Sequence, residues 1–250
     1  YRKWLNLTIR LATLAAFATA IWLTTRNLEL ITRNLALINQ QLDDQKNRET
    51  EHLFWVISRE RTSPKTRTEA FKKLIAAGNT EWRIAKLNKL DLREMDFRDL
   101  KIKNAVFEDC DFRKAQLGNS TMTKCTFKNC KMSEANLEET NFAECYFYNT
   151  NLDKANLQLA QFPKAVLEQS KIRNANLVGC DFSEAKLPMC DLTDSNLSGA
   201  KFIRANLQNV KLIRTNLQLT ILPADAGAFR GVDFTDSNWW RARYLPPKVF

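Results

Sequence analysis

A five-residue alternation of apolar and polar positions runs from Ala85 to Ala224 without a break. From Ala105 on, every fifth residue is Ala, Cys, Ser, Thr or Val, and the residue two places later is Leu, Phe, Ile or Met. A period of five fits neither an α-helix, with 3.6 residues per turn, nor a flat strand, with two. The pattern therefore predicts one side of a repeating coil rather than separate helices and strands.

The large apolar residues indicate how many sides the coil has. Like side chains recur 20 residues apart, as in the two columns Phe142, Phe162, Phe182, Phe202 and Leu117, Leu137, Leu157, Leu177, Leu197, Leu217. Stacking of like side chains at this interval predicts a four-sided coil of 20 residues. The 28 pentads between residues 85 and 224 then make about seven coils of a mainly β solenoid.

The residues of individual pentads resemble those of a known family. AlaAsnLeuGluGlu at 135–139 and AlaAsnLeuGlnLeu at 155–159 resemble the A(D/N)LXX signature of pentapeptide-repeat proteins. The resemblance covers 85–224 and, after a break, 232–246. It implies a right-handed quadrilateral parallel β-helix with the small and central residues inside. The break at 225–231 contains two glycines, shifts the register by two and is expected to bulge from the coil or bend it.

The region before the repeats has a different pattern. Residues 11–23 are apolar apart from two threonines, and extending the run to 5–25 gives a length that can cross a bilayer about 30 Å thick. We therefore predict a transmembrane helix within 1–25, with Arg10 near its amino end. A cleaved signal sequence and a buried core helix are the alternatives.

A helical stalk is predicted at 26–50, because apolar residues there keep the 3,4 spacing of a coiled coil. Its candidate seam consists of Leu28, Ile31, Leu35, Ile38 and Leu42. Leu at the first and Ile at the second seam position favours assemblies larger than a dimer, so a homo-oligomer is one expectation. A helix that packs on its own chain is the other.

Both ends of the coil are expected to be covered, since an open end exposes unpaired backbone. Residues 51–84 are predicted to form a helical cap, in which Thr66 and Glu69 make a capping box. The carboxyl-terminal segment 225–250 contains the break, the final repeats and an aromatic cap. The aromatic residues of this cap are Trp239, Trp240, Tyr244 and Phe250.

Residues able to support catalysis are scarce. His52 is the only histidine, and the chain contains no glycine-rich phosphate loop and no GxSxG motif. The cysteines occupy inward positions at multiples of five, without CxxC spacing, so they predict core packing and no metal site. They are Cys110, Cys125, Cys130, Cys145, Cys180 and Cys190. We expect no catalytic residue, cofactor or metal. Unpaired thiols favour a reducing compartment, so we expect the rod to lie in the cytoplasm. With the predicted transmembrane helix, the chain is then expected to be a single-pass membrane protein.

Charge separates one side of the predicted rod from the others. The chain carries a formal net charge of +10, but residues 85–224 contain 20 Lys and Arg against 17 Asp and Glu, with mixed signs, which disfavours nucleic acid as a partner. The side with the all-Leu column has no charge after Glu139 and is a candidate protein contact. A solvated asparagine ladder is the alternative. The candidate contact residues are Asn136, Asn156, Leu159, Asn176, Val178, Asn196, Asn216 and Leu219.

Two functions remain open on these observations. The first is a membrane-anchored, non-enzymatic scaffold whose rod binds other proteins, as a subunit or assembly factor of a membrane complex. The second follows from the resemblance, since some pentapeptide-repeat proteins are similar in shape to duplex DNA and bind gyrase. That activity implies an acidic rod, whereas the repeats here have a small positive excess. The sequence therefore favours the scaffold.

Overall fold

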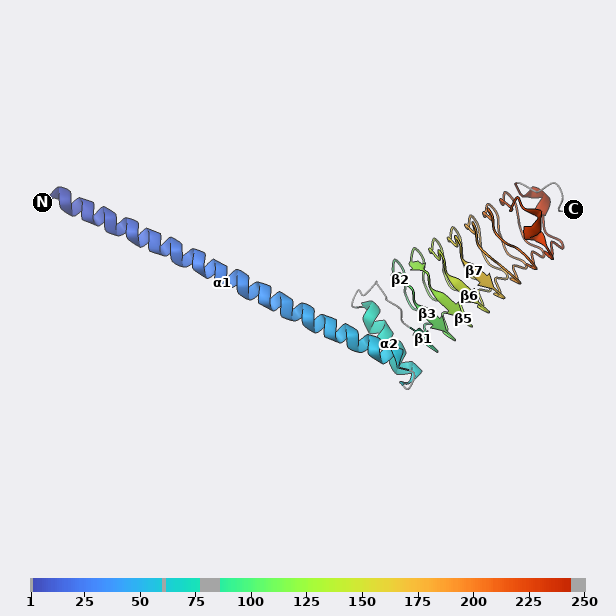
Figure 1. Cartoon of the computed structure of the whole chain (residues 1–250), viewed down its shortest axis with the longest axis horizontal. Coiled ribbons are helices and arrows are strands. Elements are labelled where there is room, and N and C mark those ends of the chain that lie inside the picture. The colour runs from blue at the N-terminus through green and yellow to red at the C-terminus, as the bar shows by residue number, and fades with distance from the viewer. Residues whose placement is uncertain (1, 60–61, 77–85, 244–250) are drawn as a thin grey trace. The chain divides into compact units, whose positions relative to one another are not determined.

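The computed structural model describes residues 2–59, 62–76 and 86–243 of the chain. The chain divides into two compact units, Tyr1–His52 and Leu53–Phe250. Helix α1 (Arg2–Ser58) makes up the first unit and ends in the second, where helix α2 (Pro64–Ala76) follows. Figure 1 shows α1 as one uninterrupted helix and the later strands as a stack of coils.

The membrane helix predicted at 5–25, and with it the single-pass localisation, is wrong. Within the described residues no helix combines the length and the apolar character needed to span a bilayer. The physical reason is the shortness of the apolar run at 11–23, which covers about 20 Å at 1.5 Å per residue, against a hydrocarbon core of about 30 Å. Arg26 and Asn27 follow the run within one turn.

The second unit is a parallel β-solenoid with the predicted 20-residue period. One sheet contains β1 (Lys86–Asn88), β3 (Val106–Glu108), β5 (Thr126–Lys128), β6 (Tyr146–Tyr148) and β7 (Val166–Glu168), in that order. A second sheet pairs β2 (Lys101–Lys103) with β4 (Thr121–Thr123). Each pairing joins residues 20 positions apart, such as Phe107 and Phe127.

Continuous sheet extends over fewer coils than the seven or so that were predicted. From β1 to β7 there are four parallel pairings, and beyond Glu168 isolated bridges such as Lys171 to Asp191 join the coils. β-branched and aromatic residues such as Val106 and Tyr146 favour extended backbone on the strand side. Lys186 and Pro188 replace them in the next coil, so the strand shortens to a single bridged residue.

Backbone hydrogen bonding explains the Asn or Asp of the signature. Where a pentad has Asn or Asp before the buried centre, the residue after the centre donates its N–H to that side chain, two places earlier, and not to the ladder. The N–H of Glu138 donates to Oδ1 of Asn136 over 3.3 Å, and the N–H of Ser183 donates to Oδ1 of Asp181 over 2.9 Å. The same position tolerates proline, because Pro163 loses no ladder bond there.

The last residue of nearly every pentad has a left-handed backbone. Lys154 has φ 60° and Leu159 has φ 58°, and most residues at this position are not glycine. In pentads outside the strands the next N–H closes a four-residue turn, as in the bond from Ala135 N–H to the carbonyl of Met132, 3.2 Å long. The five-residue pattern of residue types did not predict this left-handed backbone.

The interior is built from the predicted small and central residues. Rings stack along the coil axis, with the Phe127 and Phe147 centroids 4.8 Å apart and nearly parallel. All six cysteines are buried and free. The thiol of Cys180 donates to the carbonyl of Leu157, and burial raises the pKa of Cys190 to about 12. The cysteines therefore act as small core residues.

The two ends of the solenoid are covered to different degrees. At the first coil, Phe71 of α2 is fully buried and its ring centroid lies 5.9 Å from that of Phe97. At the last, Trp239 packs partly buried against the core, whereas Trp240 is 62% exposed and does not act as a cap. The predicted cap residues Tyr244 and Phe250 lie outside the described residues.

The break in the repeats adds two residues to one coil, as its length predicts. Its 3-10 helix η1 (Ala226–Phe229) buries Ala228 and Phe229, and the ladder resumes with Lys211 paired to Asp233, 22 residues later. A second 3-10 helix, η2 (Trp239–Arg241), follows near the end of the described chain. The insertion is thus absorbed into the stack without ending it.

Candidate functional site

The outward surface over the column of buried leucines from Leu157 to Leu217 is uncharged. Parallel bridges join each asparagine of this side to the next, 20 residues apart, from Asn136 through to Asn216. We call the surface between Asn156 and Leu219 on this side the uncharged face. Its outward residues are Asn156, Gln158, Leu159, Asn176, Val178, Gly179, Asn196, Ser198, Gly199, Asn216, Gln218 and Leu219.

The asparagines of this face are hydrogen-bonded within the rod. Nδ2 of Asn156 donates to Oδ1 of Asn136 over 3.2 Å, and Nδ2 of Asn176 donates to Oδ1 of Asn156 over 3.0 Å. Asn216 bonds to Asn196 in the same way, whereas within the described residues no such bond joins Asn196 to Asn176. Each amide oxygen also accepts a backbone N–H, as Asn176 does from Val178. The ladder therefore stabilises the coil and leaves little amide capacity for a ligand.

Beside the ladder, two leucines flank two glycines in one column. Leu159 and Leu219 are 45% and 47% exposed, and both have a left-handed backbone with φ near 58°. A Cβ on Gly179 would lie 2.7 Å from Cδ2 of Leu159, so the Leu159 side chain already covers that glycine. A Cβ on Gly199 would meet nothing within 4 Å. We call this the leucine–glycine column; the space over Gly199 is open.

The adjoining side that begins with Asp91 is charged, and several of its charges are paired. Arg113 and Asp111 form an ion pair of 2.6 Å within one pentad, and Arg214 reaches Asp194 in the preceding coil over 2.6 Å. These ion pairs neutralise charges locally, so this side does not present a continuous row of charges of one sign. The uncharged face contrasts with this side because it lacks charged residues altogether from Asn156 to Leu219.

We expect acid to weaken the rod. Side-chain hydrogen bonds from Arg93 and Arg98 lower the pKa of Asp91 and Asp96, each to about 2. A carboxyl with a lowered folded pKa stabilises the fold above its unfolded value, about 4, and loses this contribution as the pH falls toward 2. The melting temperature, followed by circular dichroism, should be nearly constant from pH 5 to 7 and fall between pH 4 and 2.

Solvent exposure keeps this effect small compared with that of the core. Replacing Arg93 and Arg98 together by alanine should flatten the decline. A melting temperature that rises on acidification would contradict the assignment.

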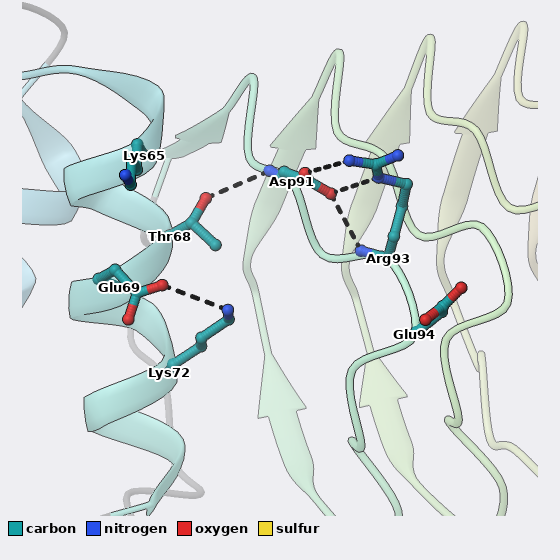
Figure 2. Close-up of a pocket in the computed structure, with 7 residues that line it drawn as sticks. All are labelled: Lys65, Thr68, Glu69, Lys72, Asp91, Arg93 and Glu94. Carbon is teal, nitrogen blue, oxygen red and sulfur yellow. Dashed lines mark hydrogen bonds and ion pairs between the residues drawn. The ribbon is translucent and has the colours of Figure 1, made fainter.

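A depression lies between α2 and the first coil of the solenoid. Figure 2 shows the N–H of Asp91 donating to Thr68, Arg93 paired with Asp91, and Lys72 paired with Glu69. Three cations and three carboxylates line it, so its charges balance. We interpret it as the junction that holds α2 on the coil. Its lining residues are Lys65, Thr68, Glu69, Lys72, Asp91, Arg93 and Glu94.

The candidate seam lies on the exposed surface of α1. Leu28, Ile31, Leu35, Ile38 and Leu42 are each more than half exposed. The structure therefore places the two sets of predicted contact residues in different units, the seam in the helix and the uncharged face on the solenoid. His52, the lone histidine, lies exposed at the end of the first unit.

Comparison with solved structures returns other solenoids of this kind. One is HetL, a pentapeptide repeat protein involved in heterocyst differentiation regulation from the cyanobacterium Nostoc sp. strain PCC 7120, with 21% identity and a TM-score of 0.29 over 73% of this chain and 98% of that one. Another is QnrB1, a plasmid-mediated fluoroquinolone resistance protein, with 17% identity and a TM-score of 0.29 over 63% and 90%. A third, Rfr23 from the cyanobacterium Cyanothece 51142, shares 18% identity with a TM-score of 0.20 over 70% and 97%.

Family models give the stronger result. No curated protein sequence is significantly similar to the chain. The model of the pentapeptide repeat region matches residues 120–197, and that of pentapeptide repeats in eight copies matches 91–129 and 190–222. Together the matches run without a gap from 91 to 222, over more than half of the chain and along the observed coils. The chain belongs to the pentapeptide-repeat family.

Proposed function

We propose that this chain is a non-enzymatic interaction scaffold whose solenoid binds a partner protein through the uncharged face. The observation that carries the proposal is the pair Leu159 and Leu219, which are half exposed on a face without charged residues. Their left-handed backbone is shared by nearly every pentad and belongs to the coil.

The chemistry of the face indicates what kind of partner fits. Its amides already bond to one another, so a partner gains little by offering hydrogen bonds to them. The open space over Gly199, together with the exposed Leu219, suits an apolar side chain of the partner instead. Energetic hot spots of protein interfaces cluster in well-packed, desolvated pockets, are enriched in Trp, Tyr and Arg, and are surrounded by contacts of smaller effect.

The test replaces Leu159 and Leu219 together by asparagine. Asparagine tolerates the left-handed backbone better than leucine, so the melting temperature of the rod should stay the same or rise. A photocrosslinking amino acid at Gln158 should trap a partner in cells, and the double variant should reduce the trapped adduct tenfold or more. Mass spectrometry then identifies the partner.

Met189 supplies a matched control. It also has a left-handed backbone and is 52% exposed, but it lies on a different side of the coil. Met189→Asn should leave the adduct unchanged. Equal adducts from the leucine double variant and the parent chain would refute the proposed contact, as would a collapse of rod stability in that variant.

The gyrase-directed alternative has less support. A protein that imitates duplex DNA needs carboxylates that present a continuous negative surface, whereas here Arg113 and Arg214 neutralise neighbouring aspartates. Addition of the purified chain to a gyrase supercoiling reaction is therefore expected to leave the rate unchanged.

A further inference from the structure

Within the first unit, α1 has no partner from its own chain among the described residues. Every side chain from residue 13 to residue 48 is exposed, and the large apolar ones keep 51% to 73% of their surface accessible. A lone helix with this much apolar surface is incomplete in water. The exposed apolar residues are Leu14, Phe17, Ile21, Trp22, Leu23, Leu28, Leu30, Ile31, Leu35, Leu37, Ile38 and Leu42.

Most of these residues form one coiled-coil seam. The main seam extends the candidate seam toward the amino end without leaving its 3,4 spacing, and its only polar residue is Thr24. The Thr24 hydroxyl donates to the backbone carbonyls of Ala20 (3.0 Å) and Ile21 (2.8 Å), so a layer of threonines leaves no hydroxyl without a partner. The main seam consists of Leu14, Phe17, Ile21, Thr24, Leu28, Ile31, Leu35, Ile38 and Leu42.

The residues that flank the main seam indicate that its occupant is a second copy of this chain. In a parallel bundle of identical helices one flanking position meets the other flanking position of the neighbouring helix, so neutral residues at both positions leave no charge repulsion between copies. These positions hold only small or neutral polar side chains, whereas Arg26, Glu29 and Arg33 point away from the seam. A seam for a different protein is usually selected by complementary charges at the flanks. The flanking residues are Ala18, Ala20, Thr25, Asn27, Thr32, Asn34, Asn39 and Gln41.

The order of the seam residues favours more than two copies. Leu28, Leu35 and Leu42 occupy the first seam position and Ile31 and Ile38 the second, an order that shifts coiled coils from dimers to trimers or tetramers.

We propose that α1 assembles three or four copies of this chain into a parallel bundle through the main seam. The proposal goes beyond the scaffold function and does not depend on it. One assembly would carry three or four solenoids, and a partner with repeated sites would then bind by avidity without any new contact.

Sedimentation equilibrium of the full chain tests the proposal. The expected mass is three or four times the 28.9 kDa of one chain. Leu28→Asp combined with Leu35→Asp should raise the dissociation constant more than 100-fold and give the mass of one chain. Arg33→Asp, a charge change on the same helix away from the seam, should keep the assembled mass. The direction is tested by Gln45→Cys, which follows the end of the main seam by three residues and should form an intermolecular disulfide only between parallel, aligned helices.

Several outcomes would overturn the proposal. They are a monomeric or dimeric parent chain, equal dissociation by Arg33→Asp, and absence of the Gln45→Cys disulfide. The melting temperature of the solenoid should be the same in all these variants, because the seam lies in the other unit. The Leu159 and Leu219 double variant should keep the assembled mass, so failure of the bundle and failure of the uncharged face are distinguishable.

Discussion

Phe127→Ala is expected to lower the free energy of unfolding of the solenoid by about 3–5 kcal/mol. The side chain is fully buried between Phe107 and Phe147, with ring centroids 5.2 and 4.8 Å away and interplanar angles of 7° and 14°. Two further rings meet it at steep angles, Phe112 at 6.1 Å and Phe142 at 5.9 Å. Removing the ring leaves a cavity that the neighbouring coils can close only by breaking their register. Urea unfolding followed by circular dichroism measures the loss.

Phe182→Ala is the matched comparison. Phe182 is equally buried but stacks on two rings only, Phe162 at 4.9 Å and Phe202 at 5.0 Å. Aromatic pairs add about 0.5–1.5 kcal/mol each beyond burial, so the loss at Phe182 should be smaller by roughly that amount or more. Because each coil contacts only its neighbours, Phe127→Ala is also expected to broaden the unfolding transition. Equal losses at the two positions would show that the ring contacts contribute nothing beyond buried area.

The coil could be predicted from sequence because one five-residue rule fixes both its interior and its period. Phe107 and Phe127 are 20 residues apart in the chain and adjacent in the sheet, as their recurrence predicts. The left-handed residue in each pentad was not predictable from the pattern, since Lys154, Leu159 and Asn174 share that backbone without sharing chemistry. The sequence pattern shows which residues are buried, whereas the left-handed turn results from closing the coil.

The uncharged face was visible in the sequence, but the reason to prefer it over other exposed residues was not. The amide bonds and the open space over Gly199 depend on which side chains lie over which, and this follows only from the stacked coils. The membrane helix was the reverse case, because the apolar run suggested a bilayer span although Arg10 and Arg26 limit its length to less than a bilayer. We propose instead that the same apolar residues belong to a seam that continues to Leu42.

Phe71→Asp is expected to detach α2 from the solenoid. Phe71 and Leu74 are fully buried on the first coil, together with Ile57 at the end of α1. A carboxylate at position 71 would lie in this apolar cluster without a partner, and we expect a loss of about 3 kcal/mol or more for the docking of α2. Hydrogen exchange of the α2 amides should accelerate at least 100-fold, while exchange in β5 and β6 stays slow.

The consequence reaches beyond α2, because the first coil ends the sheet. Among the described strands β1 pairs with β3 alone, so uncovering its other edge offers a template for a second chain. The Phe71→Asp variant should therefore associate end to end as its concentration rises, in addition to any assembly through α1. Combining it with Leu28→Asp and Leu35→Asp isolates this association. Lys72→Ala, an exposed change on the same helix, should alter neither exchange nor association. A variant that exposes α2 to exchange yet stays monomeric in the seam-disrupted background would mean that the first coil protects its own edge without α2.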